Sequence, residues 1–314
     1  MQHRIIATTN TDPGKVRERN EDSAFANVAV GEETALLIVA DGMGGYRAGD
    51  QASKIAVETI RDELEPLFVP SSAQPTVKLK QKIDENGEER STVVLPETAA
   101  SEHYGGFLTL AVRKANSNIV EYGRMHREAR GMGSTVTVTI VARNRAYFAN
   151  VGDSRSYLYR QGNLRAITRD HSLVARLVEA GEIEPDEIYA HPKRNLIYRS
   201  LGSDGERGVE VDLFEEELQP NDIIFLCSDG LWEKIRTPEM IEILRNTDDI
   251  ASICQQFIEL ANRNGGEDNI SVAMARYVGP TEPVVTSSST SAQSTPTDIA
   301  NVDTGELQTP NVSA

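Results

Sequence analysis

The chain has 314 residues, of which 39% are hydrophobic and 25% are charged, and its formal net charge is -16 at pH 7. This composition is typical of a folded globular domain, and the negative charge argues against nucleic acid as a partner, because phosphates require a basic surface. No apolar run approaches the roughly 20 residues that span a bilayer, the N-terminus lacks the apolar core of a secretory signal, and two cysteines are too few for a disulfide scaffold. We therefore expect a cytoplasmic protein without membrane contact.

The first segment, residues 3–26, leads from the apolar pair Ile5-Ile6 through a charged loop to Glu21-Asp22. Adjacent carboxylates repel each other unless a positive group lies beside them. Glu21 and Asp22 therefore indicate either a metal ion or an ordinary solvated loop, and this segment alone favours the loop.

The apolar run 36–40 predicts a strand that ends at Asp41 and enters a turn rich in glycine, Gly42-Met43-Gly44-Gly45. Glycine lets another group approach the main chain closely. Asp41 and the carbonyl oxygen of Gly42 are thus candidate ligands of a cation. An ordinary tight turn is the alternative, because a short glycine-rich motif is weak support on its own.

Apolar residues spaced by three and four positions predict two amphipathic helices, at 52–64 and 108–122. Pro66 ends the first of them. Between the helices, the segment 70–104 contains several prolines and a polar turn. We expect an insertion there, in which two short apolar stretches could pair as a hairpin.

The hydrophobic period changes after the second helix. Residues 134–141 alternate between apolar residues and threonine, as β-strands do. Further strands are predicted at 146–151, 157–159 and 164–167 with polar turns between them, so we expect a meander of antiparallel strands. Asp153 stands at the corner after the strand 146–151, as Asp41 stands after the strand 36–40.

A short helix ending at Gly181 and a polar stretch without periodicity follow, and we expect residues 172–200 to form a surface flap. A strand at 223–227 then leads directly into Asp229. Two more helices, at 238–245 and 249–262, precede Asp268 at the border of another apolar strand.

The C-terminal segment 280–314 has no aromatic and no basic residue and is rich in Ser, Thr and Pro. Such a segment cannot bury enough apolar surface to offset its ordering entropy. We therefore expect one folded domain at 1–279 and a disordered tail at 280–314.

Three separate strands thus end at or begin near an aspartate, namely Asp41, Asp229 and Asp268, and Glu21 lies near the N-terminus. We expect these carboxylates to meet around two divalent cations, because carboxylate and carbonyl oxygens suit magnesium and manganese. The few histidines form no close pair at helical spacing, which argues against zinc.

The order of these motifs resembles the metal-dependent protein serine/threonine phosphatases of the PPM/PP2C class in their bacterial form. The resemblance covers about residues 3–277. The matching sequences are Arg17-Glu18-Arg19-Asn20-Glu21-Asp22, Asp41-Gly42-Met43-Gly44-Gly45, Gly133-Ser134-Thr135, Gly152-Asp153-Ser154-Arg155, Asp170-His171-Ser172, Ser228-Asp229-Gly230 and Asp268-Asn269. The resemblance implies an α+β fold, a four-layer α-β-β-α sandwich with two central antiparallel sheets flanked by helices.

The resemblance also implies a role for each matching residue. Asp41 would bridge two metal ions, and Asp153 would hold a third. Arg17 would bind the substrate phosphate, a task that suits its planar guanidinium. The metal-site residues implied in this way are Glu21, Asp22, Asp41, Gly42, Asp153, Asp229 and Asp268, with Asp22 supporting the others.

Two positions depart from the family pattern. Met43 stands where many eukaryotic members have a histidine that protonates the leaving group, and a thioether cannot donate a proton. Glu233 stands where the family usually has an aspartate near the third metal, which puts that metal in doubt.

The implied activity is hydrolysis of phosphoserine and phosphothreonine in one step, by attack of a hydroxide that bridges two metal ions. The implied cofactors are two or three Mn²⁺ or Mg²⁺ ions, and the implied partners are phosphorylated proteins, the products of serine/threonine kinases. We expect a monomer. One alternative is a pseudophosphatase that uses the same fold as a phosphoprotein-binding module. A wider enzymatic alternative is a two-metal hydrolase that acts on a small phosphoester.

Overall fold

The structure, a computed structural model, describes residues 2–29, 31, 33–44, 48–68, 104–203 and 208–281. The expected insertion lies outside the described residues except for Tyr104. The expected tail also lies outside them from residue 282 onward, although its first two residues belong to a strand that ends at Thr281. Among the described helices, none combines the length and apolar character needed to cross a bilayer.

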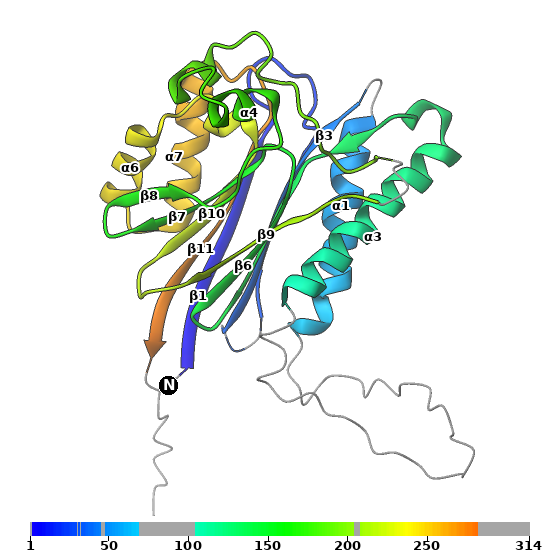
Figure 1. Cartoon of the computed structure of the whole chain (residues 1–314). Coiled ribbons are helices and arrows are strands. Elements are labelled where there is room, and N and C mark those ends of the chain that lie inside the picture. The colour runs from blue at the N-terminus through cyan, green and yellow to red at the C-terminus, as the bar shows by residue number, and fades with distance from the viewer. Residues whose placement is uncertain are drawn as a thin grey trace, which may run out of the picture. The chain divides into compact units, whose positions relative to one another are not determined.

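Two antiparallel sheets form the centre of this part of the chain (Figure 1). The first sheet has the order β1 (Gln2–Asp12), β11 (Ile270–Thr281), β10 (Ile223–Cys227), β7 (Arg155–Arg160) and β8 (Asn163–Ala166). The second has the order β2 (Asp22–Val28), β3 (Thr34–Met43), β5 (Val136–Ala142), β6 (Arg145–Val151) and β9 (Asp212–Glu217), and β4 (Gly133–Ser134) pairs with β3. Strand β9 was not predicted from the sequence.

Helices cover the outer face of each sheet. The second sheet packs against α1 (Ala48–Leu64) and α3 (Tyr104–Met125), which continue into the 3-10 turns η1 (Glu65–Leu67) and η2 (Arg127–Ala129). The first sheet packs against α5 (Asp229–Trp232), α6 (Thr237–Asn246) and α7 (Ile250–Arg263). The expected flap contains α4 (Leu173–Glu179) and η3 (Pro185–Tyr189).

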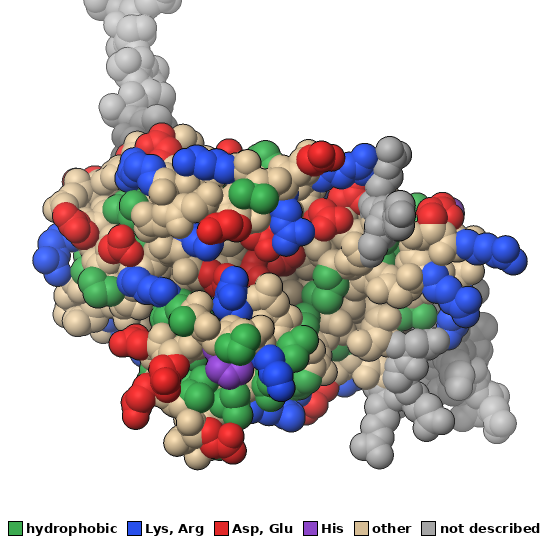
Figure 2. Space-filling model, turned by 90° about the horizontal axis from the view of Figure 1, so that it is seen from above, with side chains coloured by type: hydrophobic (Ala, Val, Ile, Leu, Met, Phe, Trp, Pro, Cys, Tyr) green, Lys and Arg blue, Asp and Glu red, His purple; other side chains and the backbone are tan. Residues whose placement is uncertain are grey.

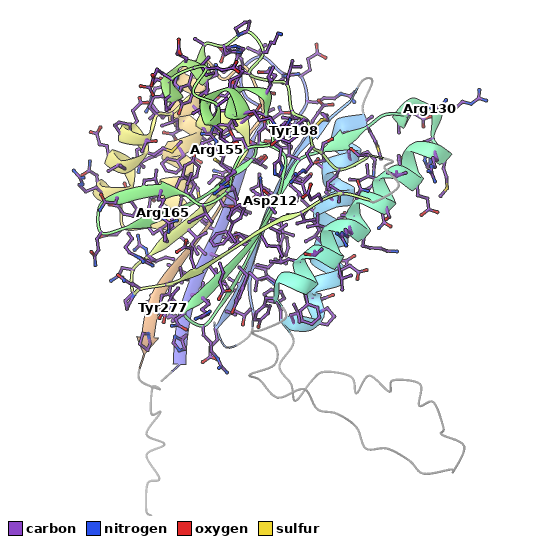
Figure 3. All side chains as sticks on the ribbon, viewed as in Figure 1. Arg130, Arg155, Arg165, Tyr198, Asp212 and Tyr277 are labelled. Atoms are coloured by element: carbon purple, nitrogen blue, oxygen red, sulfur yellow. The ribbon has the colours of Figure 1, made fainter. Side chains whose placement is uncertain are left out.

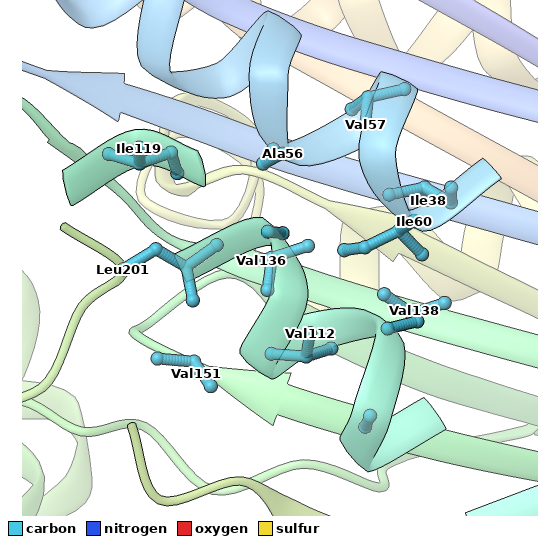
Figure 4. Packing of buried hydrophobic residues seen from close by; sticks show 14 of the residues in the cluster. Ile38, Ala56, Val57, Ile60, Val112, Ile119, Val136, Val138, Val151 and Leu201 are labelled. Carbon is cyan, nitrogen blue, oxygen red and sulfur yellow. The ribbon is translucent and has the colours of Figure 1, made fainter. Parts of the chain in front are cut away.

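Three hydrophobic clusters hold the layers together. Ile38 and Val138 of the second sheet pack against Ile60 and Val112 of its helices (Figure 4). A second cluster joins the first sheet to α7, and a third fills the space between the sheets. Burial on both faces explains why β10 and the middle of β3 are nearly continuous apolar runs. The predicted four-layer α-β-β-α sandwich is confirmed.

The predicted meander is wrong in one respect. The strands β5 and β6 pair in the second sheet, whereas β7 and β8 pair in the first, so the chain crosses between the sheets at residues 152–154. Periodicity identifies strands and turns, but it does not say which sheet a strand joins. Gly152 permits the crossing because its φ is +112°, a value that other residues rarely adopt. The crossing places Asp153 between the two sheets.

The predicted glycine-rich turn also begins later than expected, because β3 continues through Asp41 to Met43. Asp41 pairs with Asp22 across β2, and Gly42 pairs with Ser134. A side chain at Gly42 would collide with the backbone carbonyl oxygens of Gly49 and Glu21. Glycine is therefore required here because the first turn of α1 packs directly on the strand.

Candidate active site

A cavity of about 240 Å³ lies at the end of the sheets where the strands carry acidic residues. Its lining residues are Arg17, Glu21, Asp41, Gly42, Met43, Gly44, Thr135, Asp153, Asn195, Ile197, Asp229, Asp268 and Asn269. Figure 2 shows this face, with acidic side chains gathered near its middle and Lys and Arg side chains around them. The structure therefore brings strand ends from both sheets to one place.

Most of the residues singled out from the sequence meet in this cavity. Arg17, Gly42 and the carboxylates of Glu21, Asp41, Asp153, Asp229 and Asp268 all line it. Asp22 does not line the cavity and is buried beside it, where its Oδ2 atom accepts a hydrogen bond of 2.7 Å from the Ser228 hydroxyl. That bond joins β2 of the second sheet to the end of β10 in the first.

The backbone of Asp41 is fixed by the sequence Ser134-Thr135. The amide of Asp41 donates to the Thr135 hydroxyl oxygen at 3.0 Å, and its carbonyl accepts from the Thr135 amide at 2.8 Å and from the Ser134 hydroxyl at 2.9 Å. The Thr135 hydroxyl also shares a hydrogen bond of 2.7 Å with that of Ser154. The two corners that carry Asp41 and Asp153 are therefore linked directly.

Asn269 fixes the loop that carries Arg17. Its Nδ2 atom donates to the carbonyl oxygens of Pro13 at 2.9 Å and Arg19 at 2.8 Å, and its Oδ1 atom accepts from the amide of Glu21 at 2.8 Å. All polar atoms of the Asn269 side chain are thus engaged with this loop. The side chain positions both Arg17 and Glu21.

The surroundings of the clustered carboxylates disfavour their charged forms and raise their pKa values. Burial raises the pKa of Asp22 to about 6, although hydrogen bonds to this carboxylate oppose the rise. Burial and the neighbouring negative charges raise the pKa of Asp153 to about 7 and the pKa values of Asp41 and Asp229 well above their ordinary range. Each shift reflects first the burial of the carboxylate and then the negative charges near it.

Two buried oxygen atoms also indicate that this cluster of carboxylates lacks a positive partner. The Oδ1 atoms of Asp22 and Asp229 are buried and have no hydrogen-bond partner. Oxygen ligands of this kind suit a hard divalent cation, which would supply the missing positive charge. Among the described residues, no three acidic, histidine or cysteine side chains already form a closed cation cage. The carboxylates would have to draw closer around a cation, and their mutual repulsion opposes that movement until one binds.

Among the described residues that line the cavity, Arg17 is the positively charged one. Its Nη2 atom donates to Asp268 Oδ2 at 2.8 Å, and half of its side chain remains exposed. This ion pair raises the pKa of the Arg17 guanidinium further above its ordinary value. The guanidinium is therefore charged and close enough to the carboxylates to meet an anion that enters the cavity.

The flap closes one side of the cavity through Asn195 and Ile197, which sequence periodicity did not single out. Its neighbour Arg194 donates to Glu233 Oε2 at 3.2 Å. Glu233, at the position doubtful for a third metal, is thus paired with the flap and does not line the cavity.

Trp232 provides a second attachment for the flap. Its ring contacts that of Tyr189 at a centroid distance of 6.2 Å, and the Arg155 guanidinium lies 3.6 Å from the ring centroid on Trp232. The indole nitrogen donates to the carbonyl oxygen of Asp153 at 3.0 Å.

Figure 3 shows Arg155 and Tyr198 toward the cavity end of the sheets and Tyr277 at the opposite end.

A two-sheet sandwich that gathers carboxylates and one arginine at the ends of its strands has the chemistry of a cation-dependent phosphohydrolase. The chain matches the family model described as Protein phosphatase 2C over residues 15–274. The chain therefore belongs to the protein phosphatase 2C family.

Similar proteins agree with that assignment. The serine/threonine phosphatase stp of Listeria welshimeri is 36% identical over 270 residues, which cover 85% of this chain and 94% of that protein. The crystal structure of the Mycobacterium tuberculosis serine/threonine phosphatase PstP/Ppp has a TM-score of 0.68 and 34% identity, with 87% of this chain and 98% of that one covered. The catalytic domain of PstP in complex with two manganese ions gives a TM-score of 0.67 and 33% identity, with 87% and 98% covered.

Proposed function

We propose that this chain hydrolyses phosphoserine and phosphothreonine in proteins, with two or three Mn²⁺ or Mg²⁺ ions as cofactors. The observation that carries the proposal is the convergence of five carboxylates and Arg17 on one cavity in a chain of this family. The relatives are named serine/threonine phosphatases, and one of their structures contains two manganese ions. The phosphorylated proteins would be products of serine/threonine kinases.

The proposed ligands are Glu21, Asp41, the Gly42 carbonyl, Asp229 and Asp268, with Asp153 reserved for a third ion and Asp22 supporting them. When bound, such cations lower the pKa of a water molecule and withdraw charge from phosphoryl oxygens. The carboxylates would hold the cations and balance their charge.

Arg17 would bind the phosphoryl group, because its guanidinium can donate two parallel hydrogen bonds to phosphate oxygens. Two other lining residues bear on the chemistry. Met43 has no proton to give to the leaving oxygen. Thr135 already uses its hydroxyl in bonds to Asp41 and Ser154. Among the described lining residues there is no cysteine or serine, which favours hydrolysis in one step without a phosphoenzyme.

The organisation of the chain enters the proposal as well. The catalytic domain would extend from the N-terminus through β11, with a flap at 172–200 and an insertion at 70–104, and would act as a cytoplasmic monomer. The segment after β11 would be a disordered tail. Gel filtration with light scattering tests the monomer, and proteolysis from the C-terminus tests the tail.

Release of phosphate from a phosphothreonine peptide tests the activity. We expect release to depend on added manganese, to stop in EDTA and to fall by about 100-fold in Asp229→Asn, which removes a proposed cation ligand. Asp62→Asn is the matched control, because Asp62 is an exposed residue of α1 whose side chain pairs with Arg61. Equal activity of wild type and Asp229→Asn would contradict the proposal.

A second measurement tests the single step. The intact mass of the enzyme during turnover should show no added phosphate, and a covalent phosphate adduct would refute direct hydrolysis. Tight binding of the phosphopeptide without any release would instead indicate the pseudophosphatase alternative. The names of the relatives give that alternative no support.

A further inference from the structure

The loop at residues 13–20, between β1 and β2, carries three basic residues, of which Arg17 lines the cavity. Lys15, Arg17 and Arg19 alternate with Val16 and Glu18, and all five residues are exposed. The chain as a whole carries a net charge of -16. The loop is therefore positively charged, whereas the chain as a whole is negatively charged.

The loop is held firmly at both ends. Besides the two hydrogen bonds from Asn269 to its backbone, the amide of Lys15 donates to the carbonyl of Gly266 at 2.7 Å. Gly14 has a φ of +79°, and a side chain there would collide with the carbonyl of Asp268. Anchoring of the backbone limits the positions that the exposed side chains can reach, so their charges are presented in a fixed region.

The three basic residues differ in their partners. Arg17 is committed to Asp268 within the cavity, whereas Lys15 and Arg19 form no ion pair with any residue that the structure describes. Arg19 nevertheless lies close enough to Glu21 for its charge to lower the pKa of that carboxyl, although burial raises the pKa overall. Two unpaired cations therefore flank the arginine that would bind the phosphate.

We propose that Lys15 and Arg19 form a subsite for anionic side chains that flank the phosphorylated residue of a protein substrate. This inference rests on the proposed function. An anionic side chain beside the phosphorylated residue would be attracted by exposed cations near the cavity, and Lys15 and Arg19 are such cations. A flanking carboxylate and a second phosphate share the chemistry that the subsite recognises. Charged groups at the rim of an interface act mainly on encounter and specificity.

The flap carries a further exposed cation near a residue that lines the cavity. Lys193 is exposed, belongs to the flap, and lies two residues before Asn195, which lines the cavity. It also forms no ion pair with the described residues. Lys193 is therefore a third exposed cation, close in sequence to a lining residue, that an anionic peptide segment could meet.

Matched phosphothreonine peptides test the proposal. Three peptides carry glutamate, glutamine or lysine beside the phosphothreonine, and a fourth carries a second phosphothreonine in place of the glutamates. We expect wild type to favour the glutamate peptide over the lysine peptide by about tenfold in kcat/KM, through KM, with the preference declining as salt is added. The double variant Lys15→Glu, Arg19→Glu should lose or reverse this ratio, and the fourth peptide shows whether a second phosphate serves as well as carboxylates.

The control is a double variant with the same change in net charge, Lys114→Glu, Arg127→Glu. Both residues are exposed on or after α3 and do not line the cavity, so the ratio should stay as in wild type. A preference that survives charge reversal at Lys15 and Arg19, or that falls equally in the control, would overturn the subsite. Failure of wild type to hydrolyse any of the peptides would count against the proposed function instead.

Discussion

Replacement of Asn269 by alanine gives a quantitative test of how the cavity is assembled. The side chain is only 5% exposed and makes three hydrogen bonds, of 2.9, 2.8 and 2.8 Å, to the backbone of the loop at 13–21. An unmet buried backbone group costs about 1 to 3 kcal/mol, and water can reach part of this exposed loop, so about 1 kcal/mol for each bond gives a loss of about 3 kcal/mol in the free energy of unfolding.

The same substitution should affect the activity more than stability alone requires. The freed loop carries Arg17, and a hydrogen bond to a charged group contributes about 1.5 to 3 kcal/mol, which corresponds to a loss of about 10-fold to 100-fold in kcat/KM. Urea denaturation gives the first quantity. Initial rates with a phosphothreonine peptide, under conditions where the variant is folded, give the second.

Asn116→Ala is the matched control. Asn116 is also 5% exposed, accepts from the Gly202 amide at 2.8 Å and donates to the Ser203 carbonyl at 3.3 Å, but it does not line the cavity. Its variant should lose stability while kcat/KM of the folded enzyme stays near that of wild type. If Asn269→Ala is destabilised yet has unchanged kcat/KM, the positioning role of Asn269 is wrong.

Three further substitutions have expected outcomes. Asp22→Asn should raise the free energy of unfolding in EDTA by about 3 kcal/mol near pH 7.5, because the pKa of Asp22 is about 6 in the folded state against an ordinary 3.8. The charged Asp22 destabilises the wild type fully above about pH 6 and not at all below about pH 3.8, so urea curves near pH 5 should show about half of the gain. A gain that is independent of pH would contradict this explanation. Thr135→Val should cost about 1 to 3 kcal/mol by leaving the amide of Asp41 without its acceptor, whereas Thr135→Ser should restore the melting temperature. Arg194→Ala should speed proteolysis within the flap without moving the midpoint of urea unfolding, because the partly exposed ion pair of Arg194 with Glu233 contributes less than about 1 kcal/mol. An unchanged rate of cleavage would show that other contacts hold the flap.

The candidate site was predictable from the sequence because the aspartates stand at the ends of recognisable strands. Asp41, Asp229 and Asp268 each lie beside an apolar run, and the runs are long enough to identify as strands. The four-layer fold followed from the resemblance and is confirmed. Local patterns place a carboxylate at the end of a strand, but only the pairing of the sheets brings separate strand ends together.

Other features left no local signal. The crossing between β6 and β7 depends on which sheet each strand joins, and the alternating pattern is the same in either case. Asn195 and Ile197 reach the cavity from a flap segment without periodicity, so nothing in the sequence distinguishes them from solvent-facing residues. The hydrogen-bond partners of Asn269 lie in a loop about 250 residues earlier in the chain, and no sequence pattern links these two segments.

Trp232 is the only tryptophan in the chain, and its ring contacts both Arg155 and Tyr189. Indole emission responds to neighbouring charge and to solvent, so the protein contains its own optical reporter for displacement of the flap. Stopped-flow fluorescence on unlabelled enzyme could therefore follow flap motion during turnover, with Tyr189→Leu as the variant in which the aromatic contact is lost.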